Sequence, residues 1–121
     1  MTAPSAAATI RQIQRPVRPG PPYTQWDWSE TEHIVQGPAL LVARDGRVFY
    51  AGRDYPDKDK TVFGAIADGR CTPLLTLPSG GGDTGYPGLA EAPDGAVWVS
   101  FYASHEGKAA VYLARIRVSP P

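Results

Sequence analysis

Apolar residues fall into short runs along most of the chain, and turn-forming residues separate these runs. Examples are ALLVA at 39–43, RVFYAGR at 47–53 and AVWVSFYA at 96–103. Runs of this length, rich in β-branched and aromatic residues, are typical of β-strands. The pattern predicts strands at 39–43, 47–53, 61–66, 72–77, 88–92, 96–103 and 109–118. The chain is therefore predicted to be all-β.

The turn residues favour the same interpretation. Thirteen glycines and thirteen prolines interrupt a chain of 121 residues too often for long helices. Asp45-Gly46 and Asp94-Gly95 each lie between two apolar runs. An Asp-Gly pair in that setting is a strong signal for a tight hairpin. Two β-hairpins are predicted at these positions.

Two segments of the chain align with each other without a gap. One begins GPALLVARDGRVF at Gly37, and the other begins YPGLAEAPDGAVW at Tyr86, 49 residues later. A repeat of about 40–50 residues that holds several strands is typical of a β-propeller blade. The matched pairs are Pro38/Pro87, Leu40/Leu89, Ala43/Ala92, Asp45/Asp94, Gly46/Gly95, Val48/Val97, Phe49/Trp98, Val62/Val111 and Phe63/Tyr112.

The repeat divides the chain into three parts. Residues 1–36 are predicted to hold an N-terminal strand and a long surface loop rich in proline and aromatic residues. Residues 37–80 form a four-stranded blade, and residues 81–121 form a last blade of three strands. The predicted fold is thus a partial β-propeller of two antiparallel blades with seven to eight strands. The spare strand at 8–14 either completes the last blade or is the outer strand of a preceding blade.

Two blades cannot close a ring, because propellers use about four to eight. Three arrangements follow: the chain is part of a longer protein with further N-terminal blades, it is one copy in a homo-oligomer, or it is a two-sheet domain with only the blade pattern. The first is favoured.

Composition narrows the class of partner. Twelve Lys and Arg balance twelve Asp and Glu, so the chain has no net field to attract nucleic acid or an anionic membrane. No apolar run is long enough to span a bilayer, and the N-terminus lacks the pattern of a signal peptide. The single cysteine, Cys71, excludes an intrachain disulfide and leaves the compartment undecided. It is predicted to be a small, half-buried apolar residue.

Titratable residues gather at one set of strand ends. Strand direction alternates within a blade, so the start of one strand and the end of the next lie on the same side. The Asp-Gly turns are expected on the opposite side, where they carry no chemistry. The residues expected to lie together are Gln36, Arg53, Asp54 and Tyr55 in the first unit and Asp83, Thr84, Tyr86, Tyr102, Ser104, His105 and Glu106 in the second.

GPALLVARDGRVFYAGR and GGDTGYPGLAEAPDGAVWVSFYASHEGKAAVYLARI resemble the closing blades of the sialidase-like six-bladed propellers, the exo-α-sialidase superfamily. The likeness covers residues 34–118. It implies a glycoside hydrolase, with Tyr86 of the sequence GYPGL as the nucleophile. An uncharged tyrosine suits a sugar whose anomeric carbon bears a carboxylate. Arg53 is the arginine placed to clamp that carboxylate.

The remaining catalytic residues of the family have no counterpart here. Its N-terminal arginine motif, its acid/base aspartate and its glutamate partner belong to earlier blades. The resemblance therefore implies a site that is completed elsewhere.

Four further residues are candidate substrate-binding groups. Asp83 alternatively caps its own turn, and His105 and Glu106 alternatively form a polar turn. Trp26 offers a face for sugar stacking or an anchor for its loop. PSGGGD at 78–83 lacks the lysine and helix of a phosphate loop, and DYPDKDK at 54–60 is predicted to be a solvated hairpin tip. No metal-ligand spacing is present, and no cofactor is expected.

Three functions stay open. The chain contributes Tyr86 and Arg53 to a sialidase-like hydrolase that acts on terminal sialic-acid-like sugars. Alternatively, the same face binds glycans without hydrolysis, or the blade pair is structural and self-assembles into a ring.

Overall fold

The protein is all-β in the computed structural model, which describes residues 9–16, 20–55, 60–80 and 82–120. This part of the chain contains eight strands and no helix, hence no helix that could cross a membrane. The prediction of an all-β chain built from two antiparallel units is confirmed. The strands are β1 (Thr9–Pro16), β2 (Trp26–Val42), β3 (Val48–Asp54), β4 (Thr61–Ala67), β5 (Arg70–Thr76), β6 (Gly85–Glu91), β7 (Val97–Ala103) and β8 (Ala110–Ile116).

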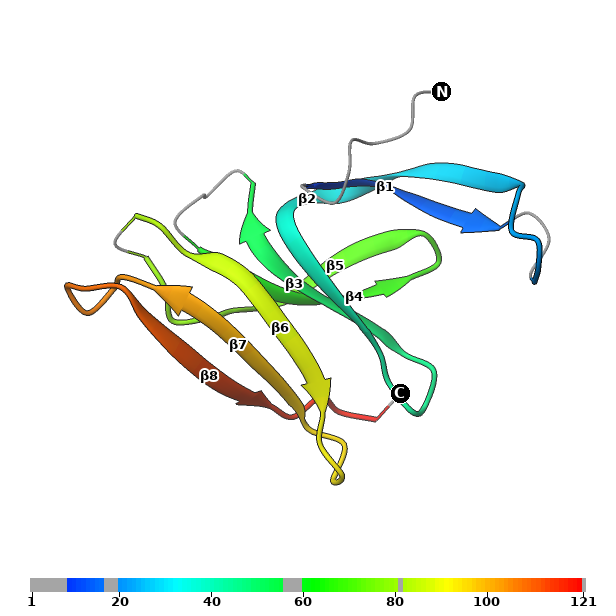
Figure 1. Cartoon of the computed structure of the whole chain (residues 1–121). Coiled ribbons are helices and arrows are strands. Elements are labelled where there is room, and N and C mark those ends of the chain that lie inside the picture. The colour runs from blue at the N-terminus through cyan, green and yellow to red at the C-terminus, as the bar shows by residue number, and fades with distance from the viewer. Residues whose placement is uncertain (1–8, 17–19, 56–59, 81, 121) are drawn as a thin grey trace.

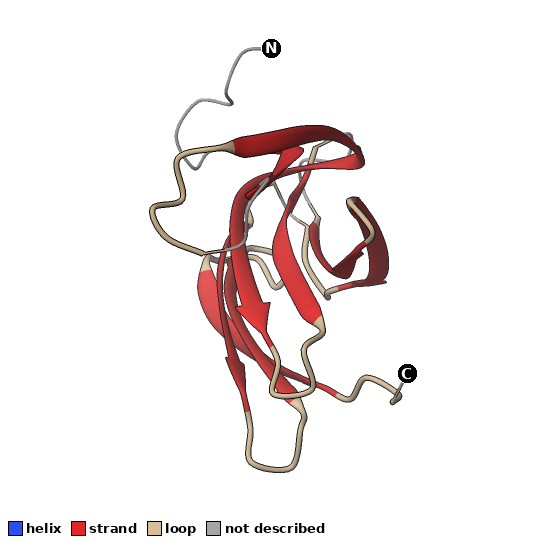
Figure 2. Ribbon diagram, turned by 90° about the vertical axis from the view of Figure 1, so that its right-hand side faces the viewer, coloured by secondary structure: helices blue, strands red, loops and turns tan. Residues whose placement is uncertain are grey.

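The strands form two sheets that lie against each other (Figure 1). The first sheet has the order β1-β2-β3-β4-β5, and the second has the order β6-β7-β8. All neighbouring strands are antiparallel, so each sheet is a meander. Figure 2, turned by 90°, shows the strands of the two sheets stacked beside one another and joined by short loops. The arrangement is compatible with a pair of propeller blades.

The N-terminal region departs from the expectation in two ways. The spare strand β1 pairs with β2, from Thr9 opposite Gln36 to Pro16 opposite Trp26, so within the described residues it does not complete the second sheet. The predicted loop is strand from Trp26 onward. The positions of the prolines are compatible with this strand. Those before Trp26 lie outside β2. Pro38 lies where the β2–β3 register shifts, so its lack of a backbone N–H removes no hydrogen bond between the strands.

Both Asp-Gly pairs form the predicted hairpin turns, with matching geometry. Gly46 N–H donates to the Ala43 carbonyl at 2.9 Å, and Gly95 N–H donates to the Ala92 carbonyl at 3.0 Å. The two glycines have φ of +90° and +87°, a region that disfavours side chains. This geometry is a turn followed by a glycine bulge, a common three-residue hairpin loop.

The main core lies between the two sheets. Phe49 and Phe63 of the first sheet are stacked with ring centroids 5.4 Å apart, and the inner residues of β7 pack against them. Alternate residues of β7 are buried along its whole length, as expected for a strand with one covered face. The buried members of this core are Ala43, Phe49, Ala51, Phe63, Leu77, Val97, Val99, Phe101 and Ala103.

Strand pairing revises the repeat after its second strand. Phe49 pairs with Ala65, whereas the matched Trp98 pairs with Arg115. The β7–β8 hairpin is therefore one residue longer than the β3–β4 hairpin. Equivalent residues of β4 and β8 are 50 positions apart in the sequence rather than 49. The structural counterpart of Phe63 is Leu113, not Tyr112.

A second, smaller core lies on the other side of the first sheet. It contains Val35, Tyr50 and Cys71, with Ile66 packed against them. The Tyr50 ring lies over Gly64, where an added Cβ would stand 2.5 Å from Tyr50 Cζ. Cys71 is buried, and burial raises the pKa of its thiol to about 11.

Candidate functional site

The end of β3, the loop before β6 and the end of β7 meet at one edge of the molecule. Gln36 pairs with Arg53 in the first sheet, and Gly85 pairs with Tyr102 in the second. The structure thus brings together Arg53, Asp83, Tyr86 and Tyr102. We refer to these four residues as the tyrosine edge.

Three of these residues form a hydrogen-bond network. Arg53 Nη2 donates to Asp83 Oδ1 at 3.1 Å, and Arg53 Nε donates to the Thr84 carbonyl at 2.9 Å. The Tyr102 hydroxyl donates to the same Asp83 oxygen at 2.7 Å. Partial burial raises the pKa of Tyr102, and the bond to Asp83 raises it further. Tyr102 is therefore kept as a neutral donor.

Tyr86 is the exposed member of the tyrosine edge. Its ring is 73% exposed and lies nearly parallel to Tyr102, with centroids 6.1 Å apart and planes 14° apart. Its φ is +45°, a conformation that is unusual for a bulky residue and that occurs preferentially at functional sites. Among the described residues, no hydrogen bond reaches its hydroxyl.

A buried pair of threonines holds this edge in place. The Thr84 and Thr61 hydroxyls are 2.8 Å apart, and Thr84 Oγ1 donates to the Tyr102 carbonyl at 2.7 Å. Both threonine residues are fully buried. The loop before β6 is thereby fixed to both sheets, so the tyrosine edge is rigid where it meets solvent.

His105 and Glu106 form a separate cluster on the β7–β8 hairpin. The Tyr112 hydroxyl donates to Glu106 Oε1 at 2.5 Å, and this bond raises the pKa of Tyr112. The His105 ring lies 4.7 Å from the Tyr112 ring. Glu106 therefore contacts Tyr112, and no bond from Glu106 to Tyr86 is found among the described residues.

Trp26 lies away from the tyrosine edge. It is the first residue of β2, ten residues before Gln36, which corresponds to about 30 Å along an extended strand. Its indole N–H donates to the Tyr23 carbonyl at 2.7 Å, and the two rings are 6.5 Å apart. Both side chains are exposed. They form a small aromatic surface at the β1–β2 turn.

Sequence reasoning missed a buried chain of polar side chains. The fully buried Tyr50 hydroxyl lies 2.7 Å from His33 Nδ1, and His33 Nε2 lies 2.9 Å from Asp54 Oδ1. Burial raises the pKa of Tyr50, so its hydroxyl stays protonated in this chain of hydrogen bonds. His33 falls in the segment predicted as loop. Its contact with Tyr50 could be predicted only from the pairing of β2 with β3.

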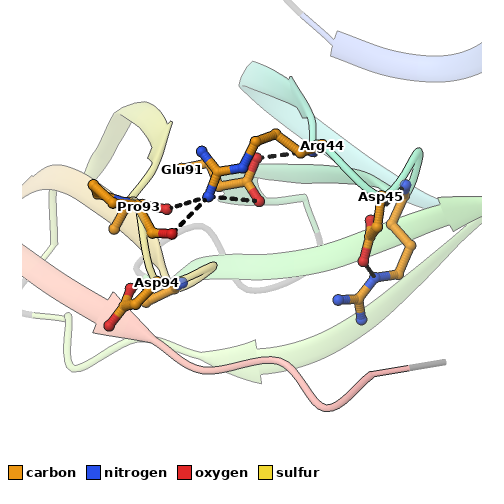
Figure 3. Close-up of polar contacts among 8 residues, drawn as sticks. Arg44, Asp45, Glu91, Pro93 and Asp94 are labelled. Carbon is orange, nitrogen blue, oxygen red and sulfur yellow. Dashed lines mark hydrogen bonds and ion pairs between the residues drawn. The ribbon is translucent and has the colours of Figure 1, made fainter.

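The opposite side, with the Asp-Gly turns, is more polar than expected. Arg44 reaches from the first sheet to the second: its Nη2 donates to the Ala92 and Pro93 carbonyls at 2.6 and 3.2 Å, and its backbone N–H donates to Glu91 at 2.8 Å (Figure 3). Asp94 is paired with Arg115 and Arg117. The Arg44 contacts join the two sheets, whereas the Asp94 pairs join the β6–β7 turn to β8 and the residues after it.

An open groove of about 480 Å³ lies beside these turns. Its charged lining includes Asp45, Arg47, Asp94 and Arg117. Each carboxylate already has an arginine partner. In the described part of the chain, no group of three or more His, Cys, Asp or Glu side chains is placed to hold a metal ion.

No protein-family model matches the chain, and neither a curated protein nor a solved structure matches it. The sialidase resemblance therefore stays a hypothesis that rests on the sequence motifs alone.

Proposed function

We propose that the tyrosine edge binds a neutral sugar without hydrolysing it. The observation that carries the proposal is the exposed Tyr86 ring, stacked on Tyr102 and adjacent to the Asp83–Arg53 pair. An aromatic face packs against the C–H face of a sugar ring, and a neighbouring carboxylate and guanidinium bond its hydroxyl groups. The rigid support from Thr61 and Thr84 lowers the entropic cost of binding.

The pairing of Arg53 with Asp83 favours a neutral sugar over a sialic acid, because the guanidinium charge already has a carboxylate partner. Its Nε and Nη2 atoms are already bonded to Thr84 and Asp83. These two bonds occupy the Nε–Nη2 edge of the guanidinium and leave only its Nη1–Nη2 edge for a ligand carboxylate. A sugar carboxylate placed there also meets repulsion from Asp83, whose side chain is 69% exposed.

Sialidase-like hydrolysis is the second candidate, and one contact favours it. Arg53 packs beside Gly85, directly before Tyr86, so the nominated clamp and the nominated nucleophile are neighbours. Hydrolysis also needs a base within hydrogen-bond reach of the tyrosine hydroxyl. Glu106 bonds Tyr112, and no hydrogen bond from a described residue reaches the Tyr86 hydroxyl, so the described contacts do not supply that base.

A binding measurement with three variants tests the proposal. Neutral and sialylated oligosaccharides are titrated against the wild-type chain, Tyr86→Ala, Tyr86→Phe and Tyr23→Ala. We expect a neutral sugar to bind, Tyr86→Ala to weaken binding at least about tenfold, and Tyr86→Phe to retain it, because the ring carries the contact. Tyr23→Ala is the control, since Tyr23 is also exposed and belongs to the Trp26 surface.

The outcomes separate the candidates. Binding that survives Tyr86→Ala but is lost in Tyr23→Ala would move the site to Trp26 and overturn the proposal. Release of sialic acid from a fluorogenic sialoside, abolished by Tyr86→Phe, would establish the hydrolase instead. No binding of any sugar would refute both.

A further inference from the structure

The outer face of the second sheet is an apolar surface that no other strand of the described residues covers. Its side chains come from alternate positions of β6, β7 and β8. Val111 is 80% exposed and Leu113 is 65% exposed, and Trp98 is half-buried beside them. A shallow hollow of about 270 Å³ lies over this face. The hollow is lined by Gly88, Leu89, Ala90, Trp98, Ser100 and Leu113.

The internal repeat shows what kind of surface this face is. Trp98 corresponds to Phe49 and Leu113 corresponds to Phe63, by the strand register. Phe49 and Phe63 are 2% and 0% exposed because the second sheet covers them. In the first sheet, the face that carries Phe49 and Phe63 is covered by the second sheet. The outer face of the second sheet is the equivalent face of the second repeat unit. A sheet is the partner that fits it.

The repeat also identifies the residues of that partner. The second sheet packs on the first through Leu89, Val97 and Ile116. Their counterparts in the first sheet have the same identities: Leu40, Val48 and Ile66.

These counterparts lie on the back of the first sheet, away from the second sheet, where none of the residues that the structure describes covers them fully. Leu40 and its neighbour Val42 are 58% and 69% exposed, and Val48 and Ile66 are half-buried. The first half of β2 covers only the other end of the back face, around Tyr50.

We propose that copies of this chain dock head to tail. In each contact, one copy contributes the outer face of its second sheet. The next copy contributes the back of its first sheet, at the end that carries Leu40 and Val42. The contact repeats between copies the packing that joins the two sheets within a copy. Such a contact is heterologous, so it continues until a ring closes. Rings of about four to eight blades correspond to two to four copies.

Charges on the docking face do not oppose this association. Arg115 stands on the outer face where the first sheet has Ala65, but its guanidinium lies over the Trp98 ring at 5.9 Å. It is also paired with Asp94 of the same copy. Docking therefore buries no unpaired charge from this residue.

The test uses one charge on each face. Leu113→Glu blocks the outer face and Leu40→Glu blocks the back face; both positions are exposed in the monomer, so both variants are expected to fold. Ala109→Glu in the exposed β7–β8 turn is the matched control. Mass is measured by light scattering from about 1 µM to about 1 mM, with circular dichroism to check folding.

Head-to-tail docking predicts that the wild-type chain and Ala109→Glu have two to four times the monomer mass and that each of the other variants is monomeric. A mixture of Leu113→Glu and Leu40→Glu should form a complex of one copy of each, because each retains the face that the other lacks. A monomeric wild-type chain throughout the range overturns the proposal. So does a Leu40→Glu variant that stays oligomeric, because that result indicates outer faces packed against each other.

Discussion

The two sheets place different residues at equivalent positions, and the difference lies on one face. In the second sheet the inner face of β7 carries Val99, opposite Ala114. At the same positions the first sheet has Tyr50 opposite Gly64. The tyrosine ring extends across the glycine and ends on a hydrogen bond to His33. At these positions the second sheet thus has an apolar face, whereas the first sheet has the hydrogen-bonded chain of Tyr50, His33 and Asp54.

A second pair of positions shows how the first sheet adapts. Phe101 of β7 fills the sheet interface, whereas its counterpart in β3 is Gly52. Val35 occupies the space over Gly52: an added Cβ there would stand 2.2 Å from Val35 Cγ1. The two sheets therefore share a backbone pattern but are covered differently. Part of the back face of the first sheet is covered by the bent strand β2, and the equivalent face of the second sheet is covered by the first sheet.

The largest expected effect comes from the core that the sheets share. Phe63→Ala removes a fully buried ring that stacks on Phe49, so it should lower the free energy of unfolding by about 3–5 kcal/mol. The control Leu74→Ala removes a side chain that is 51% exposed and should cost about 0.5 kcal/mol or less. Urea unfolding measures both. Equal losses would contradict the assigned core.

The next test breaks the packing that distinguishes the first sheet. In Gly64→Ala the new methyl group meets the Thr72 carbonyl oxygen at 2.4 Å and the Tyr50 ring, so we expect a loss of about 1–3 kcal/mol. In Gly88→Ala the new methyl group meets only the Ser100 hydroxyl, at 2.9 Å, and a rotation of that side chain relieves the contact. If the Gly88 variant is destabilised as strongly as the Gly64 variant, the proposed role of Tyr50 is wrong.

A third change removes the polar chain while keeping the ring. Tyr50→Phe removes the hydroxyl that is hydrogen-bonded to His33 Nδ1, which should cost about 1–2 kcal/mol in urea unfolding. Tyr112→Phe removes a hydroxyl that bonds Glu106 at the surface and should change stability by less than about 0.5 kcal/mol. A larger loss in the Tyr112 variant would place the important hydroxyl in the second sheet.

The smallest effect concerns the two Asp-Gly turns and pH. A backbone N–H from Ala96 and the guanidinium groups of Arg115 and Arg117 hold the pKa of Asp94 below its usual 3.8. A carboxyl with a lowered pKa in the folded state contributes stability above its unfolded pKa, and that stability is lost as pH falls through the folded value.

Asp94→Asn should therefore be less stable than wild type at pH 6 and approach it between about pH 4 and pH 2, as followed by thermal unfolding. Asp45→Asn should behave similarly, since a backbone N–H from Arg47 also lowers the pKa of Asp45. A difference from wild type that persists unchanged at low pH would show that the carboxylate charge is not responsible.

The sequence predicted the features that depend on local pattern. The Asp-Gly turns and the strands around them follow from glycine conformation and apolar runs, and they appear where expected. Local pattern also placed Arg53, Asp83 and Tyr86 at one edge, because strand direction alternates. Their mutual distances could not be predicted, since they depend on how the two sheets pack.

The features that the sequence did not show depend on distant pairing. The strand from Trp26 forms because β1 supplies hydrogen-bond partners, which its own proline-rich surroundings do not indicate. His33 meets Tyr50 only through the bend of β2. An ungapped alignment cannot show the extra residue in the β7–β8 hairpin. The pairing of β7 with β8 reveals it.

The order of the second sheet leaves β8 as an edge strand, since β1 pairs with β2 instead. In the described part of the chain, the backbone amides and carbonyls on the outer side of β8 have no strand to pair with. An open edge of this kind is a template for uncontrolled aggregation. Arg115 in β8 and Arg117 just after it, both paired with Asp94, place charged side chains at the C-terminal end of this strand, and charged side chains on an edge strand disfavour its pairing with a stray strand.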